Sequence, residues 1–176
     1  MGLVLSACSA VDGPPDAGPA ATLSSRYGAP EVSAPRDASA TASTPCQTLL
    51  TYQELASMGF AAPGRQRILI DVQECVWTNS RDERLSIAVD TTRDLLVDTY
   101  RTRLLPIFEP TSVEGMPAVR QRMRRDDNTC TVTTGLGPSQ ALETMWSGLT
   151  TRQTSDPCAE AEEAVALVVR KLPPQR

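Results

Sequence analysis

The sequence contains no histidine and only one lysine, Lys171, among its 176 residues. Without histidine, catalytic triads of the Ser-His-Asp type, Cys-His dyads and histidine-ligated zinc or haem sites are excluded. Aromatic residues make up only 4% of the chain, so aliphatic side chains must fill most of the core. We therefore expect no cofactor and no enzymatic activity, although this absence leaves carboxylate-based catalysis open.

Long apolar runs and an excess of positive charge are also missing. No stretch approaches the ~18 consecutive apolar residues of a transmembrane helix. The formal net charge of -4 argues against a general nucleic-acid binder. With 40% hydrophobic and 22% charged residues, the composition is typical of a globular domain.

The stretch Leu5-Ser6-Ala7-Cys8 has the pattern of a lipobox, in which small residues precede a cysteine that receives a diacylglyceryl group. Residues 1–8 are then the end of a lipoprotein signal, and Cys8 is the lipidated first residue of the mature protein. A signal normally has a basic segment and about 7–15 apolar residues before the cleavage site. Only Met1 to Val4 precede this stretch, so either the true start lies upstream or the match is fortuitous. We expect an anchor on the extracytoplasmic face of the cell membrane.

The remaining four cysteines, Cys46, Cys75, Cys130 and Cys158, form an even set. In an oxidising compartment they predict two disulfides, for which three pairings exist. A four-cysteine zinc site is the rival, but no C-x2-C pair is present to support it. We favour Cys46–Cys75 with Cys130–Cys158, and we expect no metal.

Composition divides the rest of the chain into two parts. Residues 9–45 are rich in Ala, Pro, Ser, Gly and Thr and carry almost no spaced apolar residues, which predicts a disordered tether. Residues 46–174 form the predicted globular domain. We expect the tether to hold this domain away from the membrane.

Within the domain, apolar periodicity predicts an alternation of helices and strands. A capping box at Thr51 and Glu54 begins a helix over 52–58, and Asp156-Pro157 begins a last helix with an apolar stripe from Cys158 to Leu172. Thr92 is the expected cap of another helix over 93–103. Strands are expected at 68–72, 74–78, 85–89, 106–114, 118–124, 129–134 and 141–148. The pattern predicts a single α+β domain in which helices pack on an antiparallel sheet.

The cysteine contexts resemble an actinobacterial lipoprotein family catalogued as domain of unknown function 3558. The matching motifs are Cys46 with Leu49-Leu50-Thr51, Cys75-Val76-Trp77, Gly115-Met116-Pro117-Ala118-Val119, Cys130-Thr131-Val132, and Asp156-Pro157-Cys158 with Ala161 and Leu172-Pro173. The resemblance implies a lipobox, a tether, two disulfides and one domain outside the membrane. The family has no established activity, so it implies no catalytic residue.

Three arginines, Arg120, Arg122 and Arg124, alternate along a predicted strand and are a candidate patch for an anionic ligand, although a solvated face is the commoner explanation. Asp94 and Asp98 are expected on an exposed helix face, and Trp77 and Trp146 in the core. We expect a non-catalytic envelope lipoprotein that binds or scaffolds an envelope protein or polymer. A carrier of a lipid or other apolar ligand is the alternative, and an enzyme would require a pair of buried carboxylates in a cleft.

Overall fold

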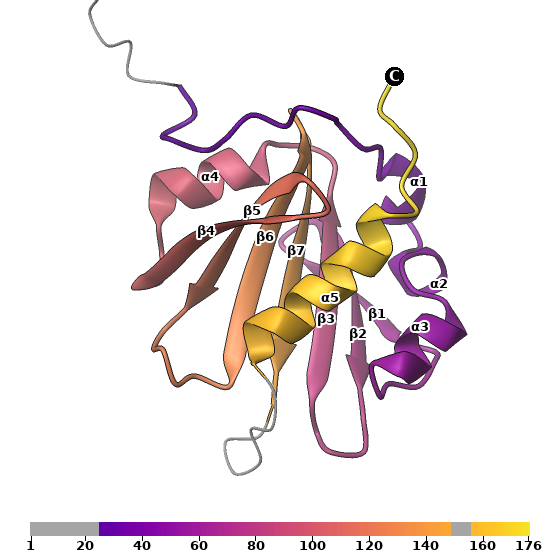
Figure 1. Cartoon of the computed structure of the whole chain (residues 1–176). Helices are drawn as coiled ribbons and strands as arrows, with labels where there is room; N and C mark the ends of the chain where they lie inside the picture. The colour runs from indigo at the N-terminus through magenta and orange to yellow at the C-terminus, as the bar shows by residue number, and fades with distance from the viewer. Residues whose placement is uncertain (1–24, 149–155) are drawn as a thin grey trace, which may run out of the picture.

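The computed structural model describes residues 25–148 and 156–176, in which seven strands form one antiparallel sheet (Figure 1). The strands are β1 (Arg65–Leu69), β2 (Val72–Thr78), β3 (Arg84–Asp90), β4 (Ile107–Val113), β5 (Met116–Arg122), β6 (Thr129–Gly137) and β7 (Gln140–Ser147). Their order is β1-β2-β3-β7-β6-β5-β4. Two runs of consecutive antiparallel strands thus meet where β3 pairs with β7.

Within these described residues, five helices pack around the sheet: α1 (Ser39–Ala42), α2 (Pro45–Thr48), α3 (Tyr52–Ser57), α4 (Leu95–Thr102) and α5 (Pro157–Val169). Helix α5 crosses one face of the sheet, with α2 and α3 beside it (Figure 1). Helix α4 packs on β6 and β7 from the opposite face, because the connection from β3 to the far edge strand β4 must cross the sheet. The predicted α+β fold with an antiparallel sheet and packed helices is confirmed.

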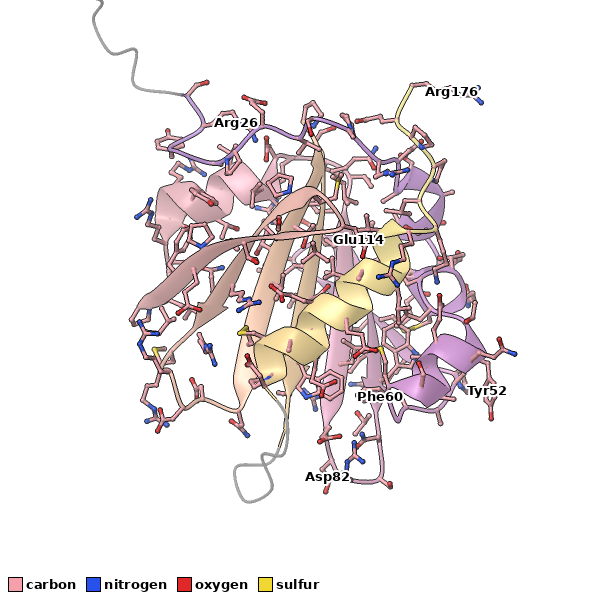
Figure 2. All side chains as sticks on the ribbon, viewed as in Figure 1. Arg26, Tyr52, Phe60, Asp82, Glu114 and Arg176 are labelled. Carbon is pink, nitrogen blue, oxygen red and sulfur yellow. A yellow bond between two sulfur atoms is a disulfide. The ribbon has the colours of Figure 1, made fainter. Side chains whose placement is uncertain are left out.

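The main core lies between α5 and the sheet. The predicted stripe of α5 is buried along its whole length, from Cys158 to Leu172. It meets the side chains of β3 and β7 that point the same way, including Ile87 and Leu142, which are fully buried. Both tryptophans belong to this core as predicted, and Phe60 packs edge-to-face on Trp146 with the ring centres 5.1 Å apart (Figure 2). Burial on this scale provides most of the stability of the fold.

Helix starts follow local sequence signals. The capping box of α3 is present as predicted: the Glu54 amide donates to Thr51 Oγ1 at 3.2 Å, and the Thr51 amide donates to Glu54 Oε2 at 2.7 Å. Asp156 caps α5 by accepting from the Cys158 amide. The expected cap at Thr92 is wrong, because Asp94 accepts from the Val97 amide and caps α4 instead.

The predicted strand over 68–72 is corrected to a tight hairpin. Ile70 and Asp71 both have positive φ, 47° and 65°, and join β1 to β2 as a two-residue turn. Apolar β-branched residues such as Ile70 normally indicate strands and avoid this conformation. A second difference is that the strand expected at 129–134 continues to Gly137 as β6, and the missing Cβ at Gly135 leaves room for Leu96 of α4.

Part of the predicted tether belongs to the folded domain. The Arg36 amide donates to Leu136 O, the Asp37 amide donates to Pro173 O, and the Ala38 amide donates to Gln140 Oε1 at 2.6 Å. Ala38 is fully buried. The predicted domain start at Cys46 is therefore too late, because composition alone does not reveal that these amides find partners on β6, β7 and the C-terminal segment. Residues 1–24, which include the predicted signal and Cys8, lie outside the described residues.

Both favoured disulfides are present. Cys46–Cys75 joins α2 to β2 with the Cα atoms 5.0 Å apart. Cys130–Cys158 joins β6 to the first turn of α5 with the Cα atoms 5.1 Å apart. The second bridge therefore holds α5 on the sheet face that it shields.

Candidate functional site

The sheet face opposite α5 is covered only in part. Helix α4 shields the β5–β6 side, where Leu96, Tyr100 and Val119 form a small second core. On the β2–β3–β7 side, three carboxylate residues face the uncovered surface: Glu74, Asp90 and Glu143. The register aligns Glu74 with Ala88 and Ala88 with Glu143, so the two glutamates lie on one face, roughly 10 Å apart between Cα atoms. Acidic residues at the centre of a sheet are unusual unless they are paired or used.

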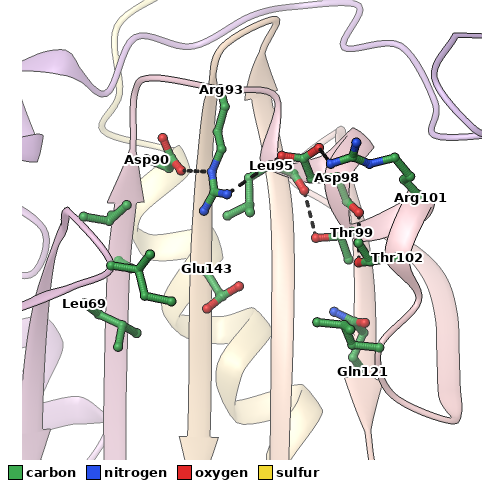
Figure 3. Close-up of a pocket in the computed structure, with 14 residues that line it drawn as sticks. Leu69, Asp90, Arg93, Leu95, Asp98, Thr99, Arg101, Thr102, Gln121 and Glu143 are labelled. Atoms are coloured by element: carbon green, nitrogen blue, oxygen red, sulfur yellow. Dashed lines mark hydrogen bonds and ion pairs between the residues drawn. The ribbon is translucent and has the colours of Figure 1, made fainter.

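A cleft of about 310 Å³ opens on this face between α4 and the β1–β2 hairpin. We call it the α4 cleft (Figure 3). Its apolar lining comes from the hairpin, β2, β3 and the two ends of α4: Leu69, Ile70, Val72, Ala88, Leu95 and Leu104. Its polar lining comes from β3, β5, β7, α4 and the segment before α4: Asp90, Arg93, Asp98, Thr99, Arg101, Thr102, Gln121 and Glu143. The combination of an apolar wall with a few inward polar groups is typical of ligand sites.

The apolar wall is exposed to an unusual degree. Ile70 and Leu104 are 83% and 81% exposed, and both line the α4 cleft. Ile70 is also the β-branched residue held at φ 47° in the hairpin turn. Backbone conformations of this kind often occur where a side chain is presented for binding. The rim of the cleft thus offers apolar surface that the domain itself does not cover.

Most charges of the cleft are compensated by neighbours. Asp90 is 1% exposed and accepts from Arg93 Nε at 2.7 Å and from the amide and hydroxyl of Thr92. Burial alone would raise the pKa of Asp90, but these hydrogen bonds and the charge of Arg93 hold it below its ordinary value. Asp98 accepts from Arg101 Nη2 at 2.7 Å. These pairs give the α4 side of the cleft a fixed and nearly neutral rim.

Glu143 and Gln121 differ from these residues. Among the described residues, neither side chain has a hydrogen-bond or ion-pair partner, although Gln121 is only 8% exposed and Glu143 is half-buried. Burial raises the pKa of the Glu143 carboxyl, and the charges of Glu74 and Asp90 raise it further against the opposing charge of Arg93. Glu74 itself is paired with Arg67. The cleft therefore contains two polar groups that a ligand could satisfy.

The predicted arginine patch lies elsewhere and is not assembled as expected. Arg120 and Arg122 are on the α5 side of β5, and Arg124 lies beyond the end of this strand. Arg120 donates twice to the Glu162 carboxylate of α5, at 2.6 and 2.5 Å. Arg122 lies 3.8 Å from Glu109 and is 12% exposed. Only Arg124 is open to solvent, with 72% of its side chain exposed. Anion binding by these arginines stays a prediction, and the carboxylates already offset much of their charge.

The residues of the α4 cleft were not predicted as a site from the sequence. Asp94 and Asp98 were expected on an exposed helix face, yet Asp94 is half-buried and pairs with Arg26, and Asp98 lines the cleft. A signal for Glu143 does exist. It is a charged residue within an alternating strand pattern, and its neighbours on the same face, Ala141 and Met145, are apolar.

Neither a metal site nor a membrane-spanning helix is found in the described residues. Within residues 25–148 and 156–176, no group of three or more Cys, Asp or Glu side chains is placed to hold a metal ion. No helix in the same ranges is long and apolar enough to cross a membrane.

Comparison with known proteins identifies the family. The family profile described as "Protein of unknown function (DUF3558)" matches residues 3–171. The chain belongs to this family. The DUF3558 match covers the whole sheet, both disulfides and the α4 cleft, and the resemblance of the cysteine motifs to domain of unknown function 3558 is thereby confirmed. No curated protein and no solved structure matches the chain significantly.

Proposed function

We propose that this protein is a non-catalytic lipoprotein of the cell envelope that binds an envelope component in the α4 cleft. The observation that carries the proposal is the cleft itself: an apolar wall surrounds two polar side chains, Glu143 and Gln121, that have no partner among the described residues. Polar groups that line a cleft and have no partner within the protein are available to hydrogen-bond a ligand.

The anchor rests on the sequence. Leu5 to Cys8 form the lipobox, and the family match begins at residue 3 and so includes it. Two disulfides suit an oxidising compartment outside the cytoplasm. We infer that a lipid on Cys8 holds the domain at the extracytoplasmic face of an actinobacterial membrane.

Most carboxylates and hydroxyls at the cleft already form ion pairs or hydrogen bonds within the protein, which agrees with binding without catalysis. A carboxylate pair acting as acid and base needs two free carboxyls, whereas Asp90 is bound by Arg93 and Glu74 by Arg67. The hydroxyls of Thr99 and Thr102 donate to carbonyls of their own helix. Among the residues described, Glu143 therefore has no base or nucleophile with which to act.

A carrier of an apolar ligand is the second candidate. The cleft volume of about 310 Å³ lies at the lower end of the ~300–1,000 Å³ of small-molecule sites. The exposed side chains of Ile70 and Leu104 would shield an acyl chain. The two candidates differ in whether the bound molecule is held through Glu143 or only through the apolar wall.

The anchor is tested by expressing the chain from an upstream start in an actinobacterial host. Intact mass and membrane partitioning are compared for wild type and Cys8→Ala. We expect lipid on the wild type, none on the variant, and release of the variant from the membrane fraction. An unlipidated wild-type protein found in the soluble fraction would contradict the proposed membrane anchoring.

The binding role is tested by photo-cross-linking in the same cells. A photoreactive residue is placed at Leu104 on the rim of the cleft or, as the control, at Tyr52, which is 70% exposed on α3 and points away from the domain (Figure 2). We expect an adduct at Leu104 that disappears when Ala88→Leu fills the floor of the cleft. Equal adducts at both positions, or an adduct that survives Ala88→Leu, would contradict the proposal. An adduct with the mass of a lipid would favour the carrier.

A further inference from the structure

The unpaired carboxylate of Glu143 limits the chemistry of the ligand. The other lining carboxylates already have cationic partners: Asp90 has Arg93, and Asp98 has Arg101. Within the described lining, Glu143 is thus the carboxylate that forms no hydrogen bond or ion pair with an arginine or lysine, and the charge of Arg93 acts on it only from a greater distance. A ligand that carries one positive charge would pair with Glu143 directly, whereas an anionic ligand would be repelled by the charges of Glu143 and Glu74.

We infer that the α4 cleft binds a primary ammonium group carried on a short aliphatic chain. The ammonium nitrogen donates hydrogen bonds to the Glu143 carboxylate and to Gln121 Oε1, and the aliphatic chain lies against the apolar wall. This inference rests on the proposed binding function and adds the class of ligand to it.

Gln121 supports the inference independently of charge. The residue is 8% exposed and lines the cleft, and its side-chain amide has no hydrogen-bond partner in the described part of the chain. Glu143 belongs to β7 and Gln121 to β5, with β6 between them. Both point toward the same cleft (Figure 3). An ammonium group has three N–H donors and can serve two acceptors at once.

The wall of the cleft favours an aliphatic stem over an aromatic or quaternary group. Val72, Leu95 and Leu104 are aliphatic, and no aromatic residue is among the cleft-lining residues that the structure describes. Quaternary ammonium ions are usually held by cages of aromatic rings, and they have no N–H to donate. Lysine-like side chains instead lay their methylene groups on apolar surface and place the charge at a polar group.

The electrostatics of Glu143 fit this role. Burial and the charges of Glu74 and Asp90 raise the pKa of Glu143 against the opposing charge of Arg93, so ionisation of this carboxyl costs free energy. A bound ammonium would favour the ionised form. Binding near the raised pKa should therefore release a proton from Glu143, and this release is measurable by titration in two buffers of different ionisation enthalpy.

The test is a calorimetric and NMR titration of the folded, disulfide-bonded protein with three probes: n-hexylammonium, n-hexanol and n-hexyltrimethylammonium. The alcohol has a similar stem without charge, and the quaternary ion has the charge without N–H donors. We expect hexylammonium to bind most tightly, with shift changes at β7 and α4. Removal of a charge-assisted hydrogen bond by Glu143→Gln should weaken this binding roughly ten- to a hundred-fold.

Glu163→Gln is the matched control, because Glu163 is exposed on α5 at the other face of the sheet and has no partner among the described residues. Binding should be unchanged in this variant. Equal binding of hexanol, or equal binding of hexylammonium to Glu143→Gln and wild type, would overturn the inference. Ala88→Leu is a second variant that should abolish hexylammonium binding by filling the cleft, without changing a charged residue.

The source of the ammonium is distinguished by a fourth probe, Nα-acetyl-lysine methylamide. Tighter binding of this probe than of hexylammonium supports a lysine of a partner polypeptide, and the reverse order supports a free amine. Suppose that no ammonium probe binds, but the cross-linked adduct at Leu104 forms in the wild type and is lost in Ala88→Leu. The inferred ligand class is then wrong, but the proposed binding function stands. If the adduct also fails, the proposed function fails with it.

Discussion

The disulfide between Cys130 and Cys158 should contribute several kcal/mol to stability. It closes a loop with a sequence separation of 28, for which the chain-entropy relation gives about 3.6 kcal/mol at about 25 °C. Both cysteines are fully buried at the junction of β6 and α5. Cys130→Ala/Cys158→Ala should therefore lower the free energy of unfolding by about 3–5 kcal/mol, since small cavities add to the entropic loss.

Urea unfolding monitored by tryptophan fluorescence measures this change, because Trp77 and Trp146 are both in the core next to the affected face. The m-value should rise as well, since the unfolded chain without the bridge exposes more surface. Cys46→Ala/Cys75→Ala is the matched comparison. Its sequence separation is 29, so the entropic part should be the same, about 3.6 kcal/mol.

Two outcomes would refute this reasoning. A loss below about 1 kcal/mol with an unchanged m-value would mean that the bridge does not restrict the unfolded chain. A much larger loss for the Cys46–Cys75 variant would mean that local packing dominates over loop closure, although Cys46 is the less buried of the cysteines. In that case the role assigned to the bridge in holding α5 would have to be abandoned.

Three further changes give distinct results. Gly64→Ala should destabilise by about 1–3 kcal/mol, because the new Cβ would lie 2.4 Å from Cys75 Sγ and 2.6 Å from Trp77 Nε1. Glu162→Gln should cost about 1 kcal/mol by breaking the double hydrogen bond with Arg120, and salt should reduce the difference. Glu143→Gln should stabilise the protein at neutral pH. Because the folded-state pKa of Glu143 is raised, wild-type stability falls as pH rises from the ordinary value to the raised one, and the variant lacks this fall.

Each of these changes has its own control. Gly148→Ala meets only Glu83 Cγ at 3.7 Å and should be nearly neutral, so equal losses at Gly64 and Gly148 would refute the packing argument. Glu163→Gln, next to Glu162 but without a partner among the described residues, should not change stability. For Glu143, the difference in unfolding free energy between variant and wild type is measured from pH 4 upward. A difference independent of pH would show that Glu74, Asp90 and Arg93 do not act on it as described.

Features that depend on a few neighbouring residues were predictable from the sequence. The capping box of α3, the Asp156-Pro157 start of α5 and its buried stripe involve residues one to four positions apart, where helix geometry determines which side chains meet. The strands that form β5 and β6 were predicted from apolar periodicity, and both tryptophans lie in the core as expected. The even number of cysteines predicted two disulfides but left three pairings possible, and the structure shows the favoured one.

The α4 cleft and the start of the folded domain depend on contacts between residues far apart in the sequence, so only the tertiary structure reveals them. Glu74, Asp90 and Glu143 face one surface only because β3 pairs with β7, strands separated in the sequence by α4 and three other strands. Ile70 adopts a turn conformation against its own preference because β1 and β2 pair on either side of it. The segment before Cys46 is ordered by amides that bond to distant carbonyls. Local sequence determines which helices and strands can form, whereas long-range pairing determines which surfaces remain uncovered, and the candidate site lies on such a surface.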